Sequence, residues 1–307
     1  MSSFSPFISV IISTYNRQDY IITCLECLAA QTLPPDKFEV IIVDNHCTDN
    51  TAALVKNFIA QNPSLPFRYV YEGQKGLSYA RNKGIKESAG SINVFLDDDA
   101  EAVPVLLQTY FDFFENNKQA AGAGGKILPK YSEAPRPKWM NEWLNGFVGK
   151  IDLGGSTRVF TGKMKYPIGC NMAYRKSILE QVGGFDNALE FRGDDKNIFY
   201  NVKKVNALIY YLPEAWVYHN IPGGRLQFAY FKTLFLKTGN EEKQRVKLSG
   251  SFFFLIIKFF EFLFKLGVSI GIWLLYAITS RELQGRYVFY SQWFTLKGFL
   301  MGKVFVR

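Results

Sequence analysis

The stretch Ile92–Glu101, with the sequence INVFLDDDAE, sets three adjacent aspartates directly behind a short and mostly apolar run. Such a run is typical of a buried strand, so Asp97, Asp98 and Asp99 are predicted to stand where that strand ends. Side chains alternate along a strand, so Asp97 and Asp99 are expected on one side and Asp98 on the other. Adjacent carboxylates repel one another, and a divalent cation that also binds diphosphate oxygens is the expected compensation. A solvated acidic turn is the alternative.

The residues before this stretch repeat the same arrangement three times. Strands are predicted at Phe7–Ser13, Phe38–Asp44 and Phe67–Glu72, with helices between them, the first capped by Asn16 and running to about Gln31. This order predicts a parallel sheet with right-handed crossovers, in which ligands gather at the carboxyl ends of the strands. Polar residues follow every one of these strands, which favours a binding site over ordinary loops. The fold class is therefore α/β, with a Rossmann-like, mostly parallel central sheet, flanking helices and a C-terminal apolar helical region.

Six motifs occur in a fixed order along the chain: STYNR, VDNHCTDNT, GLSYARNKG, FLDDDAE, GCNMAYRK and GGFDNALEFRGDD. Together they resemble the family 2 glycosyltransferases with the GT-A fold, over about residues 5 to 240. The resemblance implies an inverting enzyme that uses Mn²⁺ or Mg²⁺ to move a sugar from a nucleotide-diphosphate donor to a hydroxyl acceptor. A UDP-sugar is the donor expected first. A saccharide or a lipid-linked molecule is the expected acceptor, in cell-surface polysaccharide or glycolipid synthesis.

The resemblance also assigns roles to single residues. Asp195 matches the general base, while Asp194 replaces the family's usual glutamate and keeps an open role. Asp99 is the first candidate for a direct metal ligand, with Asp97 beside it. His219, on a predicted edge strand Pro213–His219, is a further candidate, with a structural role as the alternative.

Two larger sets complete the predicted site. Arg81 is expected near the donor's phosphates and Asp44 near its base or ribose, and a surface ion pair and helix capping are their respective alternatives. The nucleotide-binding set is Thr14, Tyr15, Asn16, Arg17, Asp44, Arg81, Asp97 and Asp98. The acceptor-side set is Asn171, Trp139 and Trp143, and for the two tryptophans ordinary packing is the alternative.

The C-terminal part is predicted to be a basic, apolar helical tail, residues 241–307, behind a catalytic domain of residues 1–240. From Lys232 onward 12 Lys and Arg face 4 Asp and Glu, whereas the residues before it carry 24 against 23. The apolar stretch Ser251–Thr279 is long enough to span a bilayer, but Lys258, Glu261 and Lys265 interrupt it on one helical face. We expect a helix that lies in the membrane surface; a spanning helix and a packing surface in a homo-oligomer are the alternatives.

Composition and cysteine usage indicate where the protein works. The four cysteines are too few and too scattered for a disulfide framework, and the N-terminal residues lack a basic leader. The expected location is cytoplasmic, peripheral or monotopic on the inner face of the cell membrane. Basic residues interleaved with Phe, Leu and Trp fit an anionic membrane surface, and no nucleic-acid partner is expected.

Three other functions are weighed against this one. Nucleotide-sugar pyrophosphorylases carry a glycine-rich loop of the GxGxR type after the first strand. The segment TYNR, which follows the first predicted strand here, is not such a loop. A processive polysaccharide synthase should carry a QxxRW-like motif and several clear membrane spans, which this sequence lacks. A non-catalytic nucleotide-sugar or carbohydrate-binding module has no need of Asp195, so the second acid cluster argues against it.

Overall fold

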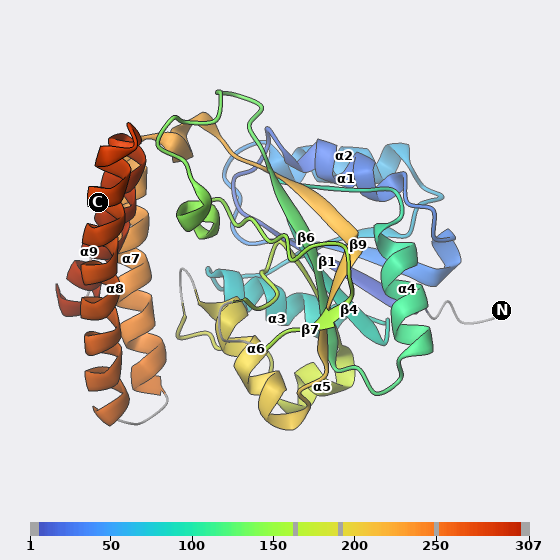
Figure 1. Ribbon diagram of the computed structural model, residues 1–307. Coiled ribbons are helices and arrows are strands. Elements are labelled where there is room, and N and C mark those ends of the chain that lie inside the picture. The colour runs from blue at the N-terminus through green and yellow to red at the C-terminus, as the bar shows by residue number, and fades with distance from the viewer. Residues whose placement is uncertain (1–5, 162–164, 190–192, 249–251, 302–307) are drawn as a thin grey trace. The chain divides into compact units, whose positions relative to one another are not determined.

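The computed structural model describes residues 6–161, 165–189, 193–248 and 252–301 (Figure 1). The chain divides into two units. The first comprises Met1–Pro129, Gly149–Glu190 and Asp194–Asn220, and the second Lys130–Val148, Phe191–Gly193 and Ile221–Arg307. The domain boundary expected at residue 240 falls within a single helix, Phe228–Leu248, that belongs wholly to the second unit.

Parallel strands form one half of the sheet in the first unit. They are β1 (Ile8–Thr14), β2 (Phe38–Asp44), β3 (Phe67–Tyr71) and β4 (Ile92–Asp97), side by side in the order β3-β2-β1-β4. Each lies where the sequence predicts a strand, and β2 is buried along its whole length, as its continuous apolar run requires. The register pairs Thr14 with Asp44 and Ser13 with Asp97, so the polar segments behind these strands meet at one edge.

Antiparallel strands form the other half, continuing from β4 in the order β8-β6-β9-β5, with β7 paired to β9. The expected edge strand at Pro213–His219 is wrong in position, because it belongs to β9, a longer strand between β6 and β5. These pairings bring distant segments to the end of β4, since Leu96 pairs with Asn171 and Ala100 pairs with His219. The bounds are β5 (Ala100–Ala102), β6 (Gly122–Lys130), β7 (Arg158–Val159), β8 (Asn171–Arg175) and β9 (Ile209–Asn220).

Helices cover both faces of this sheet, with α1 and α2 on one side and α3 on the other (Figure 1). The first helix starts at Ile21, so the expectation that Asn16 caps it is wrong. Asn16 has a φ of 53° and bonds to Thr48, which holds it in a loop. The bounds are α1 (Ile21–Ala29), η1 (Pro35–Lys37), α2 (Thr51–Gln61), α3 (Leu77–Glu87), α4 (Leu106–Asn116), α5 (Lys176–Gln181) and α6 (Asp194–Val205).

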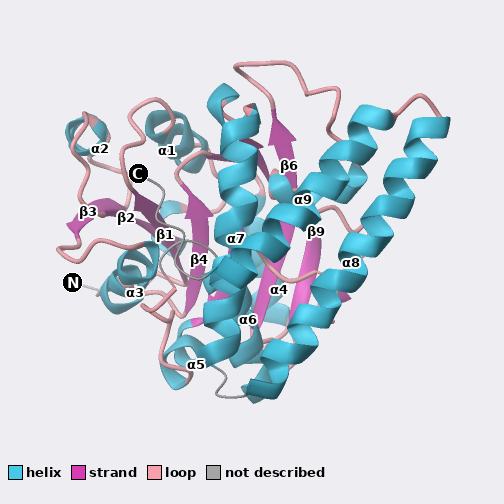
Figure 2. Ribbon diagram, turned by 90° about the vertical axis from the view of Figure 1, so that its left-hand side faces the viewer, coloured by secondary structure: helices cyan, strands magenta, loops and turns pink. Residues whose placement is uncertain are grey.

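The second unit is helical, and α9 packs against both α7 and α8 (Figure 2). Gly239 of α7 lies against the backbone of Thr295, and Gly298 of α9 against the backbone of Leu236, so the lack of a Cβ lets these two helices approach closely. Within the described ranges, every helix is too short or too polar to cross a bilayer. The bounds are η2 (Glu142–Phe147), η3 (Gly223–Leu226), α7 (Phe228–Leu248), α8 (Phe252–Ile278) and α9 (Glu282–Met301).

Candidate functional site

Arg17 compensates two of the three adjacent aspartates. Its Nε lies 3.2 Å from Asp98 Oδ1 and its Nη2 3.5 Å from Asp99 Oδ2. Burial raises the pKa of Asp98 to about 7, with the Arg17 charge opposing and the Asp99 charge adding to that rise. The expected separation of Asp98 from Asp99 is wrong, because β4 ends at Asp97 and strand alternation stops there. A guanidinium of the chain itself therefore supplies part of the positive charge that the sequence assigned to a metal ion.

Arg81 links the two acid clusters. Its side chain is buried, and its guanidinium pairs with Asp194 through Nη1 and lies 3.4 Å from Asp97 Oδ1 through Nη2. A Cβ at Gly169 would collide with this guanidinium, so the glycine makes the room for it. Burial alone would lower the pKa of Arg81, but the charges of Asp194 and Asp97 outweigh it and raise that pKa. The structure thus places Arg81 between two carboxylates, and its expected position near the donor's phosphates stays a prediction.

The second acid pair opens α6. Gly193, with a φ of 91°, precedes the helix, and the Lys196 amide donates to Asp195 Oδ1 at 2.6 Å. Carboxylates in the first turn of a helix are stabilised by its dipole. Asp194 is buried against Arg81, while Asp195 is only half-buried, so Asp195 is the more accessible of the two. Asp194 is thus engaged by Arg81, and the role of Asp195 as the base stays a prediction.

Asp44 is buried at the end of β2. The Tyr69 hydroxyl donates to Asp44 Oδ2 at 2.5 Å, and the Cys47 amide donates to Oδ1 at 2.8 Å. Burial, followed by this hydrogen bond to Asp44, raises the pKa of Tyr69. The sequence reasoning missed Tyr69, although its place two residues before the end of β3 puts it beside β2.

The loop after β1 carries the other nucleotide candidates. Thr14 is buried, while Tyr15 is exposed, with the Lys75 ammonium donating to its hydroxyl at 2.8 Å. Asn16 joins this loop to the next one, because its Oδ1 accepts from the Thr48 amide at 2.8 Å. An exposed ring beside a cation can stack on a base and attract a phosphate. Lys75 was missed by the sequence reasoning, although it stands in the polar segment behind β3.

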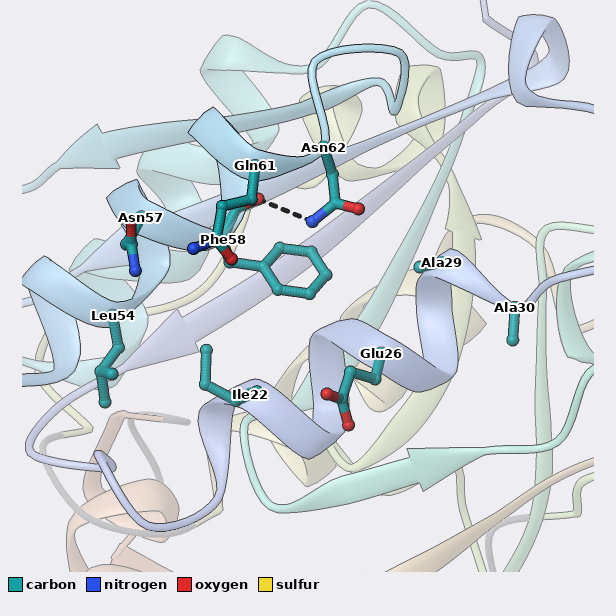
Figure 3. Close-up of a pocket in the computed structure, with 9 residues that line it drawn as sticks. All are labelled: Ile22, Glu26, Ala29, Ala30, Leu54, Asn57, Phe58, Gln61 and Asn62. Carbon is teal, nitrogen blue, oxygen red and sulfur yellow. Dashed lines mark hydrogen bonds between the residues drawn. The ribbon is translucent and has the colours of Figure 1, made fainter.

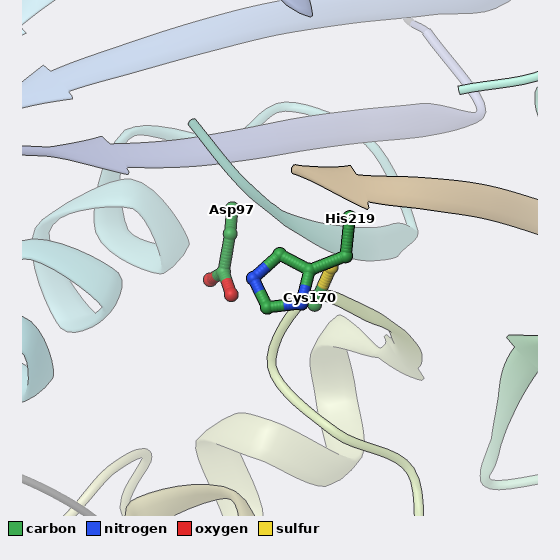
Figure 4. A group of neighbouring side chains, drawn as sticks. All are labelled: Asp97, Cys170 and His219. Atoms are coloured by element: carbon green, nitrogen blue, oxygen red, sulfur yellow. The ribbon is translucent and has the colours of Figure 1, made fainter. Parts of the chain in front are cut away.

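A group of three potential metal ligands stands at the end of β4. One ligand atom each from Asp97, Cys170 and His219 lies within 4.8 Å of the others (Figure 4). Carboxylate, thiol and imidazole together form a donor set that fits a divalent first-row ion. Two of the predicted ligands, Asp97 and His219, meet here. The third, Asp99, lies with its Oδ1 3.4 Å from His219 Nε2 and also contacts Arg17.

The acceptor-side residues have different surroundings. The prediction is wrong for the Asn171 side chain, which is fully buried, accepts from Tyr110 Oη at 2.7 Å and donates to the Ala215 carbonyl at 2.8 Å. In the second unit, Trp139 is buried and stacks on Tyr287, with ring centroids 4.5 Å apart, which is the packing alternative. Trp143 is 62% exposed and stays a candidate for binding a sugar.

A separate groove of about 620 Å³ runs between α1 and α2 (Figure 3). Glu26 is the one charged residue among those that line it, and none of the predicted site residues does so. The groove therefore lacks the chemistry expected for a nucleotide diphosphate. The lining residues are Ile22, Glu26, Ala29, Ala30, Leu54, Asn57, Phe58, Gln61 and Asn62.

A charged stripe runs along one face of α8 and consists of Lys258, Glu261 and Lys265. Its charges are paired within the second unit. Glu261 accepts from Lys258 at 2.6 Å and from Lys265 at 2.5 Å, and Lys258 also lies 3.2 Å from Glu242 of α7. Ser269, which continues the stripe, is buried. The rest of the helix exposes large apolar side chains, among them Phe252, Phe253, Phe260, Phe264 and Leu274, each with more than 60% of its surface exposed.

The chain is similar in sequence to known glycosyltransferases. Residues 9–183 match the family model described as glycosyl transferase family 2. The chain is 29% identical over 203 residues to the glycosyltransferase AglE of Haloferax volcanii, covering 63% of this chain and 60% of that protein. It is 28% identical over 189 residues to the glucosyl-dolichyl phosphate glucuronosyltransferase of the same organism, covering 61% of this chain and 58% of the relative. The chain thus spans about three fifths of the length of these two relatives.

Solved structures share the fold. The mannosyltransferase PcManGT from Pyrobaculum calidifontis, in complex with GDP-Man and Mn²⁺, matches with a TM-score of 0.59 and 21% identity, over 81% of this chain and 66% of that one. The S. aureus TarS structure in complex with UDP-GlcNAc matches with a TM-score of 0.55 and 16% identity, over 92% of this chain and 90% of that one. At these identities the likeness establishes a GT-A-like fold.

Proposed function

From the premise that the chain belongs to glycosyl transferase family 2, we propose that it is an inverting transferase acting on a nucleotide-diphosphate sugar. The acceptor is a hydroxyl group, in cell-surface polysaccharide or glycolipid synthesis. The observation that carries the proposal is the Arg81 bridge, which holds the end of β4 and the start of α6 at one edge of the sheet. Two acid clusters are thereby available for two separate tasks, holding a divalent ion that binds the donor's diphosphate and removing a proton from the acceptor.

The residues around this bridge divide the chemistry between them. Asp195, half-buried at the first turn of α6, takes the proton from the acceptor hydroxyl as that oxygen attacks the sugar. Asp194 keeps Arg81 in place, so the base stays at a fixed position relative to Asp97. Tyr15 and Lys75 offer a ring and a cation to the nucleotide. Attack from the face opposite the leaving diphosphate inverts the anomeric carbon.

A divalent ion, Mn²⁺ or Mg²⁺, is part of the proposal. Bound by Asp97 and His219, it would supply positive charge to the departing nucleoside diphosphate. The Mn²⁺ in the PcManGT complex supports such an ion. The donor's base is left to experiment, since one neighbour is complexed with GDP-Man and another with UDP-GlcNAc, and a UDP-sugar is tested first.

We extend the proposal to a membrane acceptor. The relative named as a glucosyl-dolichyl phosphate glucuronosyltransferase acts, by its name, on a lipid-linked sugar. The exposed apolar face of α8 and the basic balance of the tail suit an anionic lipid surface. The proposed location is cytoplasmic, on the inner face of the cell membrane.

Diphosphate release from a panel of UDP- and GDP-sugars, with Mn²⁺ and a lipid-linked or saccharide acceptor, tests the proposal. Asp195→Asn should abolish transfer while the donor dissociation constant changes little, because the amide cannot take up the proton. Glu180→Gln is the matched control: this residue lies on the exposed surface at α5, and its variant should transfer sugar normally. Transfer by Asp195→Asn at near the wild-type rate would remove this residue from the role of base. Donor binding without turnover on the whole panel would instead favour a binding module.

A further inference from the structure

We propose that Cys170 is a ligand of the divalent ion and that its thiolate makes the site select Mn²⁺, Co²⁺ or Zn²⁺ over Mg²⁺. The catalytic role of the ion in this inference rests on the proposed function. The binding itself follows from the three side chains of Figure 4.

The three ligands come from segments that the sheet places side by side. Asp97 ends β4, Cys170 directly precedes β8, and His219 lies near the end of β9. In a tetrahedral site with ordinary bond lengths, ligand atoms stand about 3.3–3.8 Å apart. Because the observed atoms lie within 4.8 Å of one another, small side-chain rotations of about an ångström close the site.

The position of Cys170 is held by a buried network. Asn171, next to it in the chain, bonds through its side chain to Tyr110, Ala215 and Lys126. These partners belong to α4, β9 and β6, so the residue after Cys170 is tied to three elements. A ligand fixed on rigid strands needs little reorganisation when the ion binds.

The three ligands differ in exposure, and the site reaches solvent on the side of Asp97. Cys170 is 1% exposed and His219 is 6% exposed, whereas 36% of the Asp97 side chain is exposed. Three protein ligands with one accessible side leave a coordination position for a phosphate oxygen or a water, as in catalytic metal sites.

Charge and softness then decide which ion fits. The Asp97 carboxylate and a Cys170 thiolate bring two negative charges to the ion, while His219 binds as a neutral imidazole. Asp99, 3.4 Å from His219, adds a third negative charge nearby, and the guanidinium groups of Arg81 and Arg17 offset part of it. The thiol loses its proton to solvent when the metal–sulfur bond forms, so binding releases a proton. Mg²⁺ prefers an all-oxygen octahedron and binds thiolate poorly, whereas transition ions accept nitrogen and sulfur.

The chain provides its own matched control. Cys24 is also buried, and its thiol lies 3.7 Å from the Asp97 carbonyl oxygen, but it is outside the three-ligand group. A general effect of removing a buried thiol near Asp97 should therefore appear in Cys24→Ser as well. An effect of removing a ligand should appear in Cys170→Ser alone.

The test titrates the full chain with Co²⁺ in the absence of nucleotide and follows the near-ultraviolet spectrum. The wild type should show a thiolate-to-cobalt charge-transfer band, Cys24→Ser should keep it, and Cys170→Ser should lose it with at least a tenfold loss in Co²⁺ affinity. Zn²⁺ should displace the bound Co²⁺, and a hundredfold excess of Mg²⁺ should not. Should Cys170→Ser fail to fold, a variant with Cys24, Cys27 and Cys47 changed to serine keeps Cys170 as its single thiol and should keep the band; loss of the band there would overturn the inference.

Bound Co²⁺ without the band, a band that survives in Cys170→Ser, displacement of Co²⁺ by Mg²⁺, or no Co²⁺ binding at all would each overturn the inference. The outcomes for the proposed function are separate. Sugar transfer supported equally by Mg²⁺ and Mn²⁺, with no thiolate band, would reject Cys170 as a ligand and retain the transferase. A thiolate band without transfer of any sugar would retain Cys170 as a ligand and reject the transferase.

Discussion

Replacing Arg81 with methionine removes the cation that joins Asp97 to Asp194. The exposed fraction of the side chain is 5% for Arg81 and 7% for Asp194, so the variant leaves a buried carboxylate without its cation. Breaking a buried ion pair by removing one partner costs about 3–5 kcal/mol. The contact to Asp97 adds little, because 36% of that side chain is exposed and water screens its charge. We therefore expect the free energy of unfolding to fall by about 3–5 kcal/mol in Arg81→Met.

Urea unfolding followed by circular dichroism measures this loss. The control is Lys118→Met, which removes an exposed cation 2.7 Å from Glu115 and should change the unfolding free energy by no more than about 0.5 kcal/mol. Asp194→Asn should partly rescue Arg81→Met, because a buried amide needs no counter-charge. The loss in the double variant should then be smaller than the sum of the single losses. Additive losses, or a loss in Arg81→Met no larger than in Lys118→Met, would show that the bridge does not hold the two acid clusters together.

Three further outcomes are expected. A nucleoside diphosphate at 100 times its dissociation constant should stabilise the protein by about 2.7 kcal/mol with Mn²⁺ present, and thermal shifts should lose this effect with chelator or in Asp97→Ala; equal shifts with and without metal would contradict it. Burial raises the pKa of Cys47 to about 11, so the thiol keeps its proton below that pH. Iodoacetamide at about pH 8.5 should modify Cys47 far more slowly than a free cysteine and faster as the pH rises, and mass spectrometry that finds ordinary reactivity would refute this. Phe264→Ser should weaken flotation with anionic liposomes whereas Tyr218→Ser, an exposed aromatic of β9, should not; flotation unchanged in both, or absent in the wild type, would remove α8 from the membrane contact.

The sequence was sufficient for the parallel half of the sheet and for the place of Asp97 at the end of a strand. Apolar runs such as Phe38–Asp44 can satisfy their burial only inside a sheet, and a short helix after each run forces a parallel return. The polar segments then have to meet, because the carboxyl ends of parallel strands share one edge. The apolar runs and the polar segments behind them are local features of the sequence, so they can be recognised in a single chain.

Tertiary structure alone decided which side chains meet across that edge. Arg81 and Asp194 are 113 residues apart, and the antiparallel strands β8 and β9 deliver Cys170 and His219 to the end of β4. Asn171 looks like an acceptor-side residue in its motif but is buried, because its amide satisfies carbonyl groups between strands. Such pairings depend on which distant surfaces bury the most apolar area and leave the fewest polar groups unpaired. That balance is a property of the whole packed chain, and neither residue of a pair carries a sign of it in its own neighbourhood.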